Sequence, residues 1–201
     1  MAAFALALCI VGMLLSFGLR PWLQRRRTGD SGFRGSPGAT GSWARRFLVG
    51  ALLLGVLAPI AELTDLLPLV SRLGGLRWAG AVAAVVGILA RTAAQLDMGQ
   101  SWRAGVDPAE TTELVTSGLF RQTRNPIYAF AALFYVGLAM MIPNLLAFTA
   151  LTFHLAGIEL QVRLVEEPYL LAMHGQTYQS YAARVGRFLP GIGRLPRPRS
   201  T

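Results

Sequence analysis

Five apolar runs of nearly membrane-spanning length limit what this chain can fold into. They cover Ala2–Leu19, Phe47–Leu63, Leu76–Leu96, Ile127–Ile142 and Leu145–Leu164. A helix needs about 20 mainly apolar residues to cross a bilayer, and only closed hydrogen-bonding patterns are stable there. The composition agrees, since 53% of the residues are hydrophobic and only 14% are charged. We therefore predict an all-α integral membrane protein with about five transmembrane helices.

The first run is short enough for a secretory signal, but its flanks differ from those of one. A signal peptide carries positive charge before its apolar stretch and a small-residue cleavage site after it. Here Met1–Phe4 is uncharged and the basic cluster RPWLQRRR follows the run. We therefore expect a retained helix.

Prolines mark the ends of other predicted helices. Pro59 is expected to kink or end the second helix, because proline removes a backbone donor. The fourth and fifth helices are joined only by Pro143-Asn144, which predicts a tight antiparallel hairpin at the C-terminal side.

Arginine supplies all 19 basic residues, and its distribution predicts the topology. Most of these residues lie between the first two runs or after the fifth, whereas only Arg72 and Arg77 separate the second run from the third. Arginine-rich loops stay in the cytoplasm. We expect a multi-pass protein of the bacterial inner membrane with its N-terminus outside and its C-terminus in the cytoplasm. The Gly- and Ser-rich segment Thr28–Ser42 is expected to be a flexible cytoplasmic loop.

The net charge of +9 is spread over loops beside apolar runs, so membrane lipid head groups explain it and no nucleic-acid partner is expected. Cys9 is the single cysteine, which excludes an internal disulfide. His154 fits a helix-packing donor and His174 has no partner at metal-ligand spacing, so we predict no metal site.

Two segments expected on the cytoplasmic side carry more polar chemistry than anchoring requires. They are Asp97–Tyr128 and Ile158–Pro190. In the second, Glu159, Arg163 and the pair Glu166 and Glu167 follow at helical spacing. Such a ladder fits a solvated helix face, but ionisable groups near membrane depth usually face a cavity or a partner. The two segments are therefore expected to close over one pocket.

The motif SGLFRQTRNPIY, the apolar hairpin after it and the motif VEEPYLLAMHGQTYQSYAARVGRFLP carry a resemblance. Together, from Leu114 to Pro190, they resemble the C-terminal half of the isoprenylcysteine carboxyl methyltransferase and phospholipid methyltransferase superfamily. The resemblance implies that this half encloses S-adenosylmethionine beside the membrane. It divides the chain into three N-terminal helices with a basic loop (1–96, loop 20–46) and a catalytic half (97–201) with the hairpin (127–164).

The resemblance also implies roles for individual residues. Asn125 stands where the family has a histidine, and an amide can hydrogen-bond but cannot titrate near neutral pH. Arg124, beside the helix start at Pro126, is expected to clamp the cofactor's carboxylate. The implied cofactor-binding residues are Arg124, Asn125, Pro126, Tyr128, Glu166, Tyr178, Tyr181 and Arg187.

Three residues are predicted to act in catalysis. Arg163 is expected to meet the polar end of the acceptor, and Glu166 or Glu167 to orient the acceptor or to take a proton. The acceptor is expected to be lipophilic or membrane-associated and to enter from the bilayer, with an isoprenylcysteine-like carboxylate, a thiol or a lipid amine as nucleophile. Two alternatives remain at this stage: an NADPH-dependent membrane reductase of the sterol-reductase type, and a non-catalytic scaffold or transporter subunit.

Overall fold

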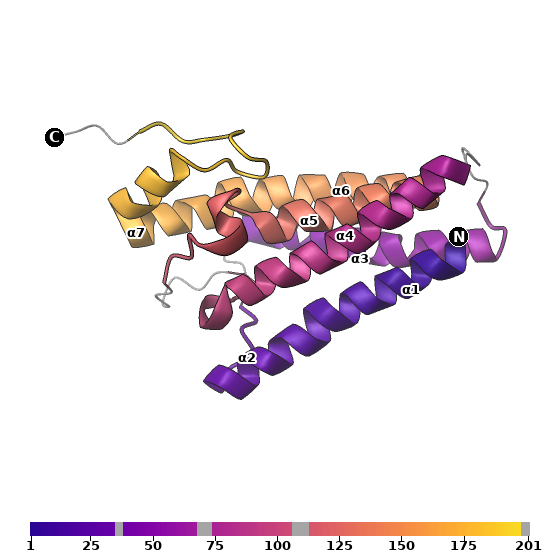
Figure 1. Cartoon of the computed structure of the whole chain (residues 1–201), viewed down its shortest axis with the longest axis horizontal. Helices are drawn as coiled ribbons and strands as arrows, with labels where there is room; N and C mark the ends of the chain where they lie inside the picture. The colour runs from indigo at the N-terminus through magenta and orange to yellow at the C-terminus, as the bar shows by residue number, and fades with distance from the viewer. Residues whose placement is uncertain (35–37, 68–73, 106–112, 198–201) are drawn as a thin grey trace.

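The computed structural model describes residues 1–34, 38–67, 74–105 and 113–197, and most of these residues are helical. Figure 1 shows long helices running side by side, with α2, α7 and the C-terminus at one end of the bundle. Arg72 and Arg199, which belong to the predicted topology, lie outside the described residues. In chain order the helices are α1 (Ala2–Met13), α2 (Arg20–Thr28), α3 (Gly38–Leu63), α4 (Gly74–Asp97), α5 (Pro126–Met141), α6 (Leu145–Gln161) and α7 (Glu167–Ala182).

Two π-helical segments connect neighbouring α-helices into continuous longer helices. Leu14–Leu19 joins α1 to α2, and Val162–Glu166 joins α6 to α7. The described chain then has four helices long and apolar enough to cross a membrane, and α5 is a shorter apolar one. This confirms the prediction of an all-α fold with about five spans. The extension of the last span into the charged segment is also confirmed.

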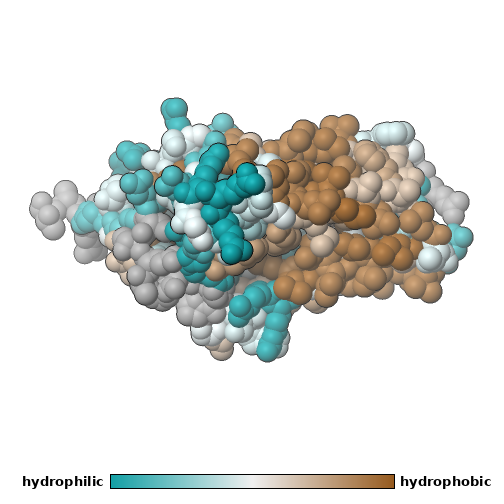
Figure 2. Space-filling view, turned by 90° about the horizontal axis from the view of Figure 1, so that it is seen from below, coloured by the Kyte–Doolittle hydropathy of each residue, from teal (hydrophilic) through white to brown (hydrophobic). Residues whose placement is uncertain are grey.

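The outer surface of the bundle is a broad apolar band. Figure 2 shows hydrophobic side chains gathered over one half of the visible face and hydrophilic ones mainly over the other. Leu14, Leu53, Val82 and Leu89 are each about 60% exposed on this surface. An exposed apolar surface of this extent suits lipid contact, as expected for an integral, multi-pass membrane protein.

Glycines let α4 and α5 pack backbone to backbone. A Cβ atom added to Gly137 would lie 2.5 Å from the backbone nitrogen of Ala84, and one added to Gly87 would lie 2.6 Å from that of Phe134. Gly80 faces Gly137 in the same way. Small residues at such crossings are typical of helix pairs in membranes, where close approach replaces the hydrophobic effect. The glycines of α4 therefore lie at its contact with α5.

Gly137→Ala is expected to destabilise the protein by about 1–3 kcal/mol, because the added methyl group would push two backbones apart. The matched control is Gly18→Ala, since a Cβ atom at Gly18 meets nothing within 4 Å. Thermal unfolding of both variants in detergent would measure the difference. Equal melting temperatures would show that the α4–α5 crossing is looser than described.

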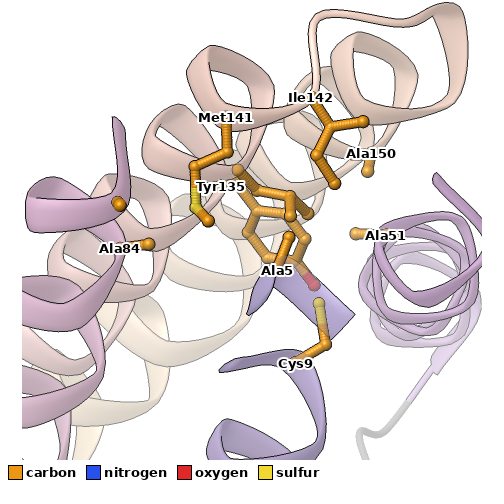
Figure 3. Packing of buried hydrophobic residues seen from close by; sticks show 10 residues of the cluster. Ala5, Cys9, Ala51, Ala84, Tyr135, Met141, Ile142 and Ala150 are labelled. Carbon is orange, nitrogen blue, oxygen red and sulfur yellow. The ribbon is translucent and has the colours of Figure 1, made fainter. Parts of the chain in front are cut away.

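The break in the hydrogen-bond ladder at Pro59 has a partner from another helix. The α3 helix continues past Pro59 to Leu63, so the proline does not end it. Because proline has no N–H, the carbonyl of Gly55, four residues earlier, loses its helical donor. The Cys9 thiol donates to that carbonyl oxygen at 3.4 Å. Cys9 is thus a buried core residue, and Figure 3 shows it beside Tyr135 among small residues such as Ala5 and Ala51.

Asn144 fixes the turn between α5 and α6. Its side-chain oxygen accepts from the backbone N–H of Ala147 at 3.0 Å, and its amide nitrogen donates to the carbonyl of Ala58 in α3, also at 3.0 Å. Asparagine is a favoured residue at the start of a helix for this reason. The tight hairpin predicted from Pro143-Asn144 is confirmed, and the turn is also tied to α3.

Part of the loop expected to be flexible has a defined partner. The Arg34 N–H donates to the carbonyl of Ala104 at 2.8 Å, and the Ala104 N–H donates to that of Gly32 at 2.9 Å. Phe33 packs edge-on against Trp102. Within the expected loop Thr28–Ser42, residues 32–34 therefore pair with the segment after α4, whereas Thr28 ends α2 and Gly38–Ser42 forms the start of α3, so the expectation of a flexible loop was wrong for these parts; residues 35–37 lie outside the description. The division of the chain near residue 96 stays a prediction.

Arg20, expected to contribute to the basic cluster, is buried instead. Its guanidinium donates to the carbonyl of Gln95 and to the side chain of Gln24, both at 3.0 Å, and lies 4.8 Å from the centre of the Trp102 ring. These contacts attach α2 to the end of α4 and support the segment that carries Trp102.

Candidate functional site

A cavity of about 500 Å³ lies where the loops at the polar end of the bundle meet the helices. Its wall is formed by α3, α4, α5, α6 and α7, the π-helical segment after α1, and residues 33–34, 98–105 and 113–125. Cavities of this size suit a small-molecule cofactor. The two segments predicted to close over one pocket, Asp97–Tyr128 and Ile158–Pro190, both contribute to it; residues 106–112 lie outside the description.

Most of the predicted site residues line this cavity, but three do not. Among the described residues, Arg163, Glu167 and Arg187 are absent from its wall. Those that line it are Arg124, Asn125, Pro126, Tyr128, Glu166, Tyr178 and Tyr181.

Glu167 forms a buried ion-pair network with two arginines behind the cavity. Its carboxylate accepts from the Arg124 guanidinium at 2.6 Å and from that of Arg187 at 2.8 and 2.9 Å. The Arg124 and Glu167 side chains are 1% and 7% exposed. Hydrogen bonding to this carboxylate raises the pKa of Arg187 above its ordinary value. Arg187 follows the last helix, so the network attaches the C-terminal segment to the bundle.

The Arg124 guanidinium also binds three backbone carbonyls of the C-terminal region. It donates to Ala182 at 2.9 Å, to Val185 at 2.6 Å and to Gly193 at 3.1 Å. Only Nε is buried without a partner. This differs from the predicted cofactor clamp, because a guanidinium with both terminal nitrogens occupied cannot offer the two parallel donors that a bidentate carboxylate contact requires.

Asn125 binds the same C-terminal segment. Its side-chain N–H donates to the carbonyl of Arg187 at 3.0 Å, and its backbone N–H donates to that oxygen at 3.1 Å. The Thr123 hydroxyl donates to it as well, at 2.9 Å. An amide is sufficient for this contact, which needs a donor and no titration. Asn125 therefore positions the segment while also lining the cavity.

Glu166 is the predicted carboxylate that does line the cavity. Its Oε1 atom accepts from the Tyr128 hydroxyl at 2.6 Å and from the Gln161 amide at 3.1 Å. Glu166 ends the π-helical segment, and the wider turn there changes which side chains face inward. Adjacent glutamates consequently have separate environments: Glu166 lines the cavity and Glu167 pairs with the arginines.

Tyr178 and Tyr181 of α7 form an aromatic part of the wall. Their ring centres are 6.2 Å apart in an edge-to-face arrangement, and the Tyr181 hydroxyl donates to the carbonyl of Phe120 at 2.6 Å. Both rings are buried. The fixed edges and faces of such rings suit the binding of a planar base.

Arg163 lies outside the site. Its side chain is 52% exposed and pairs with Glu159, one turn earlier on the same helix. The structure therefore shows the solvated pair that was the alternative interpretation of this ladder.

Several cavity residues were not predicted from the sequence. Arg91 and Gln95 lie one turn apart on α4, and Trp102 and His154 complete other parts of the wall. The signal for Arg91 was available, since an ionisable residue within an apolar run is a functional candidate. His154 is a buried packing residue near the Tyr128 carbonyl, as expected, but it also lines the cavity.

Comparison with known proteins agrees with this architecture. The sequence profile described as phospholipid methyltransferase matches residues 76–177, just over half of the chain. The chain therefore belongs to the phospholipid methyltransferase family, and it is a membrane protein of a methyltransferase family. A comparison with curated proteins gives no match.

The fold is similar to that of the eukaryotic intramembrane Ras methyltransferase, isoprenylcysteine carboxyl methyltransferase, solved without a monobody. The TM-score is 0.56 and the sequence identity 21%, and the match covers 77% of this chain. It covers 53% of that chain, so the present chain spans about half the length of the solved protein.

The polar atoms at the cavity fit organic ligands, a cofactor and its acceptor, with charged and polar groups. Three buried side-chain atoms of cavity residues have no hydrogen-bond partner among the described residues: Arg91 Nε, Gln95 Oε1 and Arg124 Nε. An unpaired buried polar atom costs about 1–3 kcal/mol, which a bound ligand would relieve. With the Glu166 carboxylate and the tyrosine wall, the cavity offers donors, acceptors and an aromatic surface.

Proposed function

We propose that this protein transfers a methyl group from S-adenosylmethionine to a lipophilic acceptor that enters from the bilayer. The observation that carries the proposal is the cavity itself, which combines unpaired polar atoms, one ordered carboxylate and an aromatic wall at the polar end of an apolar bundle. Membership of the phospholipid methyltransferase family supports the reaction type.

The residues of the C-terminal half would hold the cofactor. The Glu166 carboxylate, fixed by Tyr128 and Gln161, would bind its ammonium group or ribose hydroxyls. The rings of Tyr178 and Tyr181 would form the wall for its adenine. When bound, S-adenosylmethionine supplies an electrophilic methyl group on a sulfonium centre. Arg124, Asn125 and Arg187 would act indirectly, by holding the C-terminal segment against the bundle.

The protein's own contribution to the reaction would be alignment and the exclusion of water. Positioning of two reactants can supply several kcal/mol of the barrier reduction. A carboxylate or thiolate acceptor needs no base. An amine acceptor must be unprotonated for its lone pair to attack the methyl group, and the Glu166 carboxylate would be the group that takes the proton from an ammonium form.

Incubation of the purified protein with labelled S-adenosylmethionine and a membrane lipid extract tests this function. We expect a labelled, lipid-soluble product whose mass is one methyl group greater than that of a lipid in the extract. The mass of its fragments identifies the nucleophile as oxygen, sulfur or nitrogen. If no labelled lipid forms while S-adenosylhomocysteine binds, the acceptor class is wrong.

The proposed orientation places the cavity on the cytoplasmic side. In a Cys9→Ser background, Leu66→Cys is expected to react with a membrane-impermeant maleimide added outside the cell, because this 74% exposed residue follows α3 at the end opposite α2. Arg27→Cys, at the exposed end of α2, is expected to react only after the membrane is opened. The reverse pattern of labelling would show that the protein has the opposite orientation in the membrane.

A further inference from the structure

We propose that Arg91 binds the anionic head group of the methyl acceptor, and that the acceptor's apolar tail lies between α1 and α3. The head group would be a carboxylate or a phosphate, which share the oxyanion chemistry that a guanidinium recognises. This inference rests on the proposed methyl transfer, because it assigns the acceptor side of the same cavity.

Arg91 lies in the interior of the helix bundle, and the residues that the structure describes give its Nε atom no hydrogen-bond partner. Its Nε atom is buried and unpaired, and the described part of the chain gives it no ion pair. The ring centre of Phe17 lies 6.0 Å from its guanidinium carbon. Burying an unpaired charge is costly, so ionisable groups at such depth usually have a functional partner.

Arg91 lines two adjoining cavities of different size. It contributes to the large cavity and also to a smaller one of about 40 Å³, which extends deeper into the bundle. The smaller cavity is almost entirely apolar and lies among α1, α3, α4 and α5. Its other residues include Cys9, Gly12, Met13, Leu52 and Gly55.

This arrangement fits an amphiphile better than a wholly polar ligand. A head group at Arg91 would be within the large cavity, which carries polar side chains such as Gln95 and Glu166, and a chain extending from it would pass Phe17 towards the smaller apolar crevice. Gln95, one turn along α4, has an unpaired side-chain oxygen near the same part of the wall. It could accept a hydrogen bond from a head-group N–H or O–H.

The cofactor and acceptor assignments use different elements. Glu166, Tyr178 and Tyr181 belong to the last helices, whereas Arg91 belongs to α4 and contacts the segment after α1. The sequence had assigned the acceptor's polar end to Arg163, which is exposed and paired with Glu159. Arg91 meets the requirements of that role, because it lines both cavities and its Nε atom is buried and unpaired, whereas Arg45, which also lines the large cavity, is exposed.

The test is binding, measured by calorimetry on the full chain in nanodiscs of neutral lipid. The probes are dodecanoate, dodecyl phosphate and the uncharged dodecanol. Wild type is expected to bind at least one anion more tightly than dodecanol. Arg91→Gln is expected to weaken that binding by about tenfold or more and to leave dodecanol unchanged. Preference for dodecanoate indicates a carboxylate acceptor, and preference for dodecyl phosphate indicates a phosphate-bearing one.

Two further variants keep the inference falsifiable. Arg91→Lys, which retains the charge, is expected to restore most of the preference for anions. Arg46→Gln removes an exposed arginine that lies over Trp43 outside the cavity, and is expected to behave as wild type. The inference is overturned if wild type shows no preference for either anion, or if neither Arg91 variant alters it.

Titration with S-adenosylhomocysteine separates this inference from the proposed function. Arg91→Gln is expected to bind this product within about twofold of wild type, because the carboxylate and aromatic groups of α6 and α7 are intact. An equal loss of product and anion binding would mean that Arg91 serves the cofactor, which overturns the acceptor assignment. Failure of wild type to bind the product would instead contradict the proposed function.

Discussion

Arg124→Ala is expected to lower the free energy of unfolding by about 3–5 kcal/mol, because it breaks a buried ion pair and leaves Glu167 incompletely compensated. The variant also removes the donor to three backbone carbonyls of the C-terminal segment. The Arg187 contact would remain, so the lower half of this range is the expected result.

Thermal unfolding in detergent, with Arg27→Ala as the control, measures this effect. Arg27 is exposed on α2 and contributes none of these contacts. A variant that keeps its melting temperature but loses about 2–4 kcal/mol of S-adenosylhomocysteine binding would support the cofactor clamp predicted from the sequence. It would contradict the structural role proposed for Arg124.

Glu166→Gln is expected to raise the dissociation constant for S-adenosylhomocysteine by about 10- to 100-fold, since hydrogen bonds to a charged group contribute roughly 1.5–3 kcal/mol. The Tyr128 hydroxyl and the Gln161 amide would then donate to a neutral amide oxygen, which is a weaker acceptor than the carboxylate. Calorimetry measures the change directly.

The matched control for Glu166 is Glu159→Gln. Glu159 lies on the same helix, is 45% exposed and pairs with Arg163 outside the cavity. We expect product binding close to that of wild type. If the two glutamine variants bind equally well, Glu166 does not contact the cofactor, and the carboxylate assignment fails.

The helices were predictable because their signals are local. Apolar runs of sufficient length indicate membrane spans. Only Pro143 and Asn144 separate the fourth run from the fifth, so these two helices must form a tight hairpin. Small residues such as Gly80 and Gly87 favour close helix packing, but the sequence does not show that α5 is the helix they meet. The π-helical segments were not predictable in this way, because a single wider turn changes the direction of the following side chains without altering the hydrophobic pattern.

The partners of individual arginines were the part that sequence could not supply. Arg20, Arg91 and Arg124 face inward, whereas Arg163 faces outward, although all four border apolar segments. The direction depends on which helix covers each face. Arg187 reaches Glu167 only because the C-terminal segment folds back, a contact between residues 20 positions apart that no helical spacing indicates.

The segments that carry the resemblance to known methyltransferases do line the cavity. The resemblance implied the same role, cofactor binding, for nearly all of their motif residues. The structure separates these residues into side chains that line the cavity, such as Tyr128 and Glu166, and side chains that hold the C-terminal segment, such as Glu167 and Arg187. Adjacent residues on one helix can have such different environments because a helix rotates by about 100° per residue.

Calorimetric titration of the purified wild-type protein with S-adenosylhomocysteine, and separately with NADPH, tests the central claim most directly. The account predicts saturable binding of S-adenosylhomocysteine at one site per chain, weakened by Glu166→Gln, and no saturable binding of NADPH. Binding of NADPH with no response to S-adenosylhomocysteine would contradict it and would indicate a membrane reductase.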